Sequence, residues 1–269
     1  MKVYISMDME GVAGVTAWDQ TNKEGGSDYE RCRRLMTAEA SAAVAGAFDG
    51  GATAVLVNDS HGRMRNLYAE ELDPRARLIQ GSPKPWSMVE GLDDTCACAL
   101  FCGYHAPGSE QGVLSHTYTG FVHRVRVNGV MVGEAGLNGY YAGTFGVPVV
   151  LLTGDDRACA NARALFPGIH TVETKRAITR YSAESLSPTQ SCSAIRAGAA
   201  QAVRAAANIA PIRATLPVRI EVEMADVGQA DAAVLMPGTV RVDGVTLAYE
   251  AQDYATALRA MRTWLSLAR

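Results

Sequence analysis

The stretch MKVYISMDMEGVAG, residues 1–14, contains the first element of the fold and its first candidate site. From Val3 to Met9, apolar side chains at odd positions alternate with more polar ones at even positions. This period of two is typical of a β-strand. Asp8 and Glu10 fall on the same face at the far end of the strand, and Gly11 follows directly. We expect this glycine to let a substrate come close.

Working outward, the strand pattern recurs between helical segments. Residues 29–51 have apolar side chains at steps of three and four and end in two glycines, which predicts a helix. Short apolar runs that end in polar residues follow at 52–62, 96–108 and 148–156, and a helical pattern covers 155–166. Alternating strands and helices favour an α/β fold with a mostly parallel sheet and flanking helices.

The second part of the chain has a different character. Residues 123–134 contain two alternating runs around Asn128-Gly129, a strong hairpin signal. An alanine-rich helix over 187–212 is followed by a strand, a second hairpin and a closing helix. We predict an α/β catalytic domain over residues 1–180 and a smaller C-terminal α+β lobe over 181–269.

Composition narrows the classes of partner. The 269 residues are 48% hydrophobic with a formal net charge of −3, so no nucleic acid and no anionic membrane is expected as a partner. The N-terminus lacks the features of a signal peptide, and no apolar run reaches the roughly 18 residues of a membrane span. We expect a cytoplasmic protein.

Several of the predicted strands end in groups that bind metals. Asp8 and Glu10 end the first strand, His61 follows the second, and His105 follows the third. Ligands in open α/β sheets bind beyond the carboxyl ends of the strands, where these side chains would meet. Glu134, after the hairpin, and His116, on a loop shortly after His105, are further candidates.

The residue types indicate which metal. Carboxylates mixed with imidazoles suit zinc, manganese or cobalt better than calcium or magnesium. Five ligands exceed the three or four of a single zinc site, so two ions that share Asp8 fit the count better. His123, in the hairpin, and His170, at a turn, are expected to have no direct role. No phosphate-binding loop or GxSxG motif is present.

The sequence resembles the zinc-dependent D-aminopeptidase family of the DppA type. The resemblance rests on blocks in the same order, among them SMDMEGVAG, VLVNDSHGRM, KPWSMVEGLDD, LFCGYHAPG, VLSHTYTG, VGEAGLNGYYAG, LLTGDDRA and LMPGT. It runs from residue 1 to about 158 and returns near 220–240. Between about 160 and 215 it is weak.

The resemblance implies a dinuclear zinc site with Asp8 bridging two zinc ions and the other ligands falling on Glu10, His61, His105 and Glu134. It implies a catalytic role for His116, as nucleophile or general base. It also implies removal of N-terminal D-amino acids, such as D-Ala, from short peptides by a homodecameric ring with an internal chamber.

Several alternatives stay open at this stage. Metal-activated water is the expected nucleophile, so we favour proton transfer by His116 over direct attack. Lys84 either contacts a substrate carboxylate or belongs to a structural loop. Another dinuclear metallohydrolase, an amidohydrolase or a phosphoesterase, would use the same ligand types. A metal-binding or assembly protein without catalysis would not need His116.

Overall fold

The computed structural model describes all 269 residues and contains a large, mostly parallel sheet. Its spatial order is β3-β2-β1-β4-β7-β8-β9, and every neighbouring pair is parallel except β8 and β9. The strands are β1 (Lys2–Met7), β2 (Ala54–Asp59), β3 (Ala76–Ile79), β4 (Cys96–Tyr104), β7 (Val149–Asp155), β8 (His170–Thr179) and β9 (Ser182–Ser185). The predicted α/β class with a parallel sheet is confirmed.

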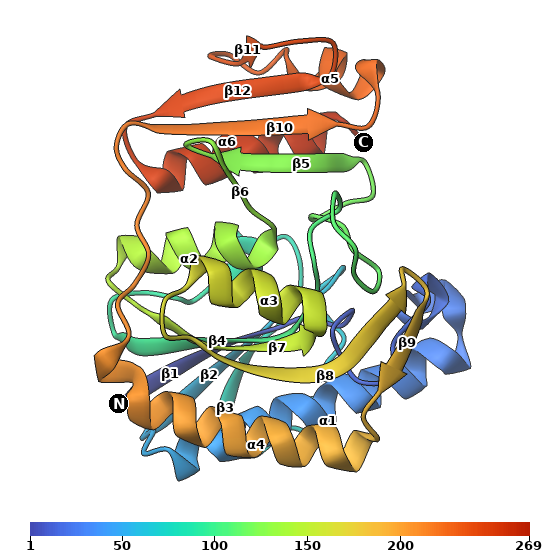
Figure 1. Ribbon diagram of the computed structural model, residues 1–269, viewed down its shortest axis with the longest axis vertical. Helices are drawn as coiled ribbons and strands as arrows, with labels where there is room; N and C mark the ends of the chain where they lie inside the picture. The colour runs from blue at the N-terminus through green and yellow to red at the C-terminus, as the bar shows by residue number, and fades with distance from the viewer.

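Helices cover both faces of this sheet (Figure 1). The helices α1 (Ser27–Asp49) and α4 (Pro188–Ala205) pack against each other on one face, and α2 (Glu134–Thr144) and α3 (Asp156–Leu165) lie on the other. Gly46 makes the contact between α1 and α4 possible, because a Cβ atom there would lie 2.3 Å from the carbonyl oxygen of Arg196. Four short 3₁₀ helices complete this part: η1 (Trp18–Gln20), η2 (Lys23–Gly25), η3 (Ser87–Val89) and η4 (Ala206–Asn208).

A second, antiparallel sheet has the order β11-β12-β10-β5-β6. Its strands are β5 (Val122–Val127), β6 (Val130–Met131), β10 (Val218–Met224), β11 (Val240–Arg241) and β12 (Thr246–Ala251), and its helices are α5 (Val227–Ala233) and α6 (Tyr254–Leu267). The predicted turn at Asn128-Gly129 is confirmed, with φ angles of 49° and 82° that suit a two-residue hairpin.

The second sheet draws on both sides of the predicted boundary at residue 180. The hairpin β5-β6 comes from the middle of the chain but pairs with β10, whereas α4, placed by sequence in the smaller lobe, packs on the first sheet. Helix α6 lies along the second sheet and contacts α2, and Tyr254 donates a hydrogen bond of 2.7 Å to the carbonyl oxygen of Leu137. One hydrophobic cluster includes residues of both parts, for example Phe101 on β4 and Trp264 on α6. The two lobes therefore share a core.

The sheet order determines where functional groups meet. The strands β2, β1 and β4 are immediate neighbours and parallel, so their carboxyl ends lie together at one edge. This is the arrangement that the polar strand ends predicted. None of the helices combines the length and the apolar character that a membrane-spanning segment needs.

Candidate metal centre

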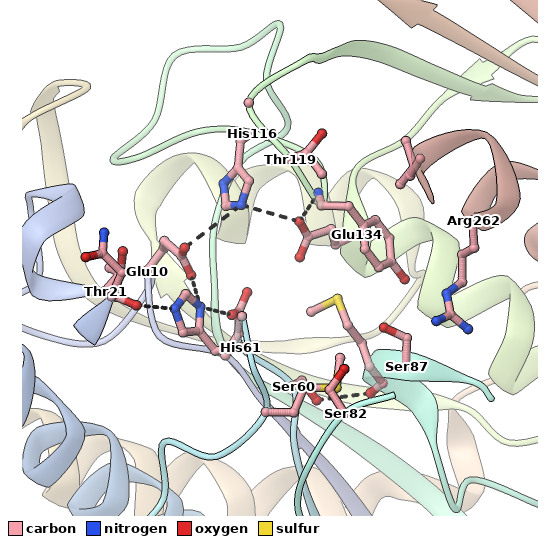
Figure 2. A pocket seen from close by; sticks show the side chains of 18 of the residues that line it. Glu10, Thr21, Ser60, His61, Ser82, Ser87, His116, Thr119, Glu134 and Arg262 are labelled. Carbon is pink, nitrogen blue, oxygen red and sulfur yellow. Dashed lines mark hydrogen bonds and ion pairs between the residues drawn. The ribbon is translucent and has the colours of Figure 1, made fainter. Parts of the chain in front are cut away.

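The five residues predicted as metal ligands converge at this edge of the sheet, and Figure 2 shows three of them, Glu10, His61 and Glu134. Asp8 and Glu10 lie in the turn after β1, His61 follows β2, His105 follows β4, and Glu134 is the first residue of α2. All five are buried, with at most 9% of any residue exposed. So many titratable groups are rarely buried together without a compensating cation.

Asp8 is at the centre of the group. Its Oδ1 lies 3.2 Å from Nδ1 of His61, and its Oδ2 lies 3.4 Å from Nε2 of His105. Glu10 approaches the same His61 nitrogen at 2.9 Å, and Glu134 lies 3.5 Å from Nε2 of His105. The two carboxylate oxygens of Asp8 thus face two separate pairs of donors, which is the geometry expected of a shared ligand.

Three of these buried atoms, Oδ2 of Asp8, Oε2 of Glu10 and Nε2 of His105, lie close to groups of opposite charge but make no hydrogen bond with acceptable geometry. Buried polar side-chain atoms are almost always paired in native proteins, so an unpaired cluster requires an explanation. Oxygen and imidazole nitrogen donors together suit a zinc ion. The residues present therefore fit the metal that the sequence predicted.

The charges of the cluster support the same conclusion. Burial raises the pKa of Asp8, and the neighbouring carboxylate of Glu10 raises it further. Burial lowers the pKa of His61 and of His105, but the carboxylates around them outweigh this effect and raise each pKa well above its usual value. The raised pKa values of both imidazoles reflect the concentrated negative charge of the carboxylates, which a divalent cation would compensate.

Surrounding groups orient the two imidazoles. Nε2 of His61 lies 2.6 Å from the carbonyl oxygen of Thr21, so Nδ1 faces the carboxylates. Nδ1 of His105 lies 2.9 Å from the carbonyl oxygen of Ala106, so Nε2 faces them. A backbone carbonyl that binds the outer nitrogen directs the other nitrogen to a metal, and this is the usual arrangement around metal-binding histidines.

His116 lies beside Glu10, Glu134 and His105 at the edge of the cluster. Its Nε2 is 3.9 Å from Oε1 of both Glu10 and Glu134, and its ring stacks on His105 with centroids 4.1 Å apart. Its Nδ1 lies 2.9 Å from the carbonyl oxygen of Leu114, which turns Nε2 toward the site. His105, His116 and Glu134 lie close enough to form a ligand group of their own, so distance alone allows His116 either role.

The other two histidines lie elsewhere. His123 is on β5 with half of its side chain exposed, 3.8 Å from Glu223. His170 begins β8 and therefore lies at the opposite, amino end of the sheet. Neither lines the cavity at the candidate centre.

Gly11, which we expected to let a substrate come close, instead allows close backbone packing. A Cβ atom at this position would lie 2.1 Å from the carbonyl oxygen of Tyr104, and the Gly11 amide donates a hydrogen bond of 2.7 Å to the carbonyl oxygen of Gly103. The glycine therefore lets the turn that carries Glu10 pack directly against the end of β4. It does not make room for a substrate.

Lys84 also proves structural. Its ammonium donates to Oδ1 of Asn58 at 2.5 Å and to the carbonyl oxygen of Asp59 at 2.6 Å. Burial lowers its pKa to about 8. The side chain is committed to supporting the end of β2, so the structural alternative for this loop holds.

Two supporting residues were missed by sequence reasoning. The carboxylate of Asp59 accepts hydrogen bonds from the backbone of the loop after His61, and the ammonium of Lys175 donates to carbonyl oxygens of Glu10, Val12 and Val15. Asp59 could have been suspected from its place in the NDSHG segment. Lys175 carries no local signal, because it lies on β8, 165 residues from Glu10.

A cavity of about 670 Å³ opens onto the centre. Its walls come from both lobes, including Trp18 and Tyr118 near His116, and Arg262 and Ser266 on α6. A space of this size is typical of a pocket for a small molecule or a short peptide.

The chain matches the profile of the peptidase M55 family, D-aminopeptidase, over residues 1–263. This chain belongs to the D-aminopeptidase family. It is 44% identical to the D-aminopeptidase of Bacillus subtilis (strain 168), over 100% of this chain and 98% of that protein. The solved structure of the Zn-dependent D-aminopeptidase DppA from Bacillus subtilis, a self-compartmentalizing protease, matches it with a TM-score of 0.97 and 43% identity, over 100% of this chain and 98% of that one. The family resemblance, the fold class and the assignment to the peptidases are confirmed.

Proposed function

We propose that this D-aminopeptidase family member uses two zinc ions, bridged by Asp8, to remove N-terminal D-amino acids such as D-Ala from short peptides. The observation that carries the proposal is the buried group of carboxylate and imidazole side chains, several of whose atoms make no hydrogen bond, at one end of a cavity. The relative of known structure is Zn-dependent. Glu10 and His61 lie beside one oxygen of Asp8, and His105 and Glu134 lie beside the other.

When bound, zinc ions would polarise the scissile carbonyl and lower the pKa of water beside it. His116 is the residue that we assign to proton transfer. Its Nδ1 is held by the Leu114 carbonyl, so Nε2 is free to take a proton from the attacking water and return it to the leaving amine. Direct attack by Nε2 is the competing role, and a covalent His116 adduct trapped during turnover would establish it.

The carboxylate of Glu10 or of Asp8 is also suited to binding the free ammonium group of the substrate. Such a contact would explain why the enzyme acts on N-termini, because an acetylated N-terminus carries no charge and no ammonium hydrogen. Efficient turnover of N-acetyl-D-Ala-D-Ala would argue against this role.

We further propose a cytoplasmic homo-oligomer, with a decameric ring as the expected assembly. Support comes from the self-compartmentalizing relative and from the six free cysteines of this chain, which suit a reducing compartment. Sedimentation analysis of the purified protein tests the number of subunits.

The central experiment compares D-Ala-D-Ala with L-Ala-L-Ala, using metal-stripped and zinc-reloaded protein. We expect release of D-alanine from the D-peptide alone, restored by zinc, with two zinc ions per subunit by elemental analysis. Zinc-independent or absent cleavage would contradict the proposal. Turnover of p-nitrophenyl phosphate in place of the peptide would favour a phosphoesterase.

A further inference from the structure

The cavity has the metal centre on one side and a cationic side chain on another. Asp8, Glu10 and Glu134 lie at one end, and the guanidinium of Arg262 lies on the side away from Glu10 and His61 (Figure 2). Arg262 belongs to α6, so this positive charge comes from the second lobe. A short peptide cleaved at the metal centre would extend its C-terminal carboxylate into this cavity, where a guanidinium can pair with it.

Arg262 is held in place by backbone groups. Its guanidinium donates hydrogen bonds to the carbonyl oxygens of Pro85 and, at 3.3 Å, of Lys84. It takes part in none of the ion pairs of the chain, although it is partly buried. A guanidinium has five N–H groups, so donors remain for a ligand in the cavity.

Tyr118 and the metal ligand Glu134 line the same cavity as Arg262. The backbone amide of Tyr118 donates a hydrogen bond of 2.5 Å to Oε1 of Glu134. A ligand in this cavity can therefore contact both the metal centre and the guanidinium.

The other cations near the cavity are less suited to this purpose. Arg180 is exposed, stacks on Trp18 and donates to the carbonyl oxygen of Ser115, beside His116 at the metal end. Arg269 is exposed on the chain after α6. Lys84 uses its ammonium within the protein.

We propose that Arg262 binds the C-terminal carboxylate of the peptide substrate and so restricts the enzyme to short peptides with a free C-terminus. This inference rests on the proposed peptidase function. A guanidinium fork pairs with a carboxylate through two parallel hydrogen bonds, whereas a C-terminal amide offers one oxygen and no charge. The second lobe would thereby set the length and the end group of the substrate.

The test measures kcat and KM for D-Ala-D-Ala and D-Ala-Gly-Gly, each as the free acid and as the C-terminal amide, with zinc-loaded protein. For at least one length, wild type should prefer the acid by about 10- to 100-fold, the range of a charged hydrogen-bonded contact. Arg262→Met should remove this preference by raising KM for the acid and should leave the amide unchanged. Arg262→Lys, which keeps the charge but loses the fork, should recover part of it.

Arg259→Met is the matched control, because Arg259 lies one turn earlier on α6 and stacks on Trp86 at 4.2 Å without lining the cavity. It should behave as wild type. Equal use of acids and amides by wild type, or an equal loss for both in Arg262→Met, would overturn the assignment while the peptidase function stood. If wild type cleaved none of the four peptides, the proposed function would fail, and this assignment with it. Thermal unfolding of each variant shows whether it folds. If Arg262→Met has a folding defect, the preference of Arg262→Lys for the acid over the amide tests the assignment instead.

Discussion

Asp59 organises the loop that carries His61, and its removal offers a quantitative test of the site. The residue ends β2 and is fully buried. Its carboxylate accepts hydrogen bonds from the backbone amide of Asn66 at 2.5 Å, from that of Leu67 at 2.8 Å, and from Nδ2 of Asn66 at 2.7 Å. The same Asn66 amide group donates to the carbonyl oxygen of His61 at 2.8 Å. Asp59 therefore connects the folded loop to a metal ligand.

Asp59→Ala would leave three buried donors without an acceptor. Each such donor costs about 1–3 kcal/mol, and partial access of water reduces the sum, so we expect the free energy of unfolding to fall by about 3–5 kcal/mol. The free energy of unfolding of a typical domain is about 5–15 kcal/mol, so the variant should still fold. Because the loop also orients His61, zinc affinity should drop by about 10- to 100-fold, as for other residues that support metal ligands.

Chemical denaturation of the metal-free proteins measures the free energy of unfolding, and competition with a chelator measures the zinc affinity. Asp93→Ala is the control, since Asp93 also accepts several hydrogen bonds but has a side chain that is 48% exposed. Asp93 precedes the amino end of β4, whereas the metal centre lies at the carboxyl ends of the strands. Its loss should cost less than about 1 kcal/mol and leave zinc binding unchanged. An Asp59→Ala protein with the stability and zinc affinity of this control would refute the reasoning.

Four further variants test the centre and its surroundings. His61→Ala or Glu134→Ala should lose bound zinc and activity together, measured by elemental analysis beside peptide turnover; full metal content would show that the residue is not a ligand. His116→Ala should keep its zinc and lose most turnover, and loss of zinc would make it a ligand instead. Burial lowers the pKa of Lys84 from 10.5 to about 8, so between these values the unfolded chain binds more protons than the folded one. Wild-type stability should therefore rise relative to Lys84→Met as the pH increases from about 8 to 10.5, and a constant difference in denaturation midpoints would contradict this.

Much of the fold could be predicted because its signals are local. The period of two before Asp8, the apolar runs before His61 and His105, and the Asn128-Gly129 turn each lie within a few residues. Parallel neighbours then bring their carboxyl ends to one edge, so a list of polar strand ends becomes a site. The short strand β3, which has four residues and none fully buried, gave no comparable signal and was not predicted.

By itself, the sequence determined the α/β class, the family and the candidate ligands, since these depend on short-range patterns and on residue types. Only the tertiary structure decided that the β5-β6 hairpin joins β10, that Gly11 packs against Tyr104, and that Arg262 reaches the cavity. Such contacts join residues 90 or more positions apart. They form because the whole chain must bury its apolar surface and pair its backbone at once, and no local pattern records that requirement.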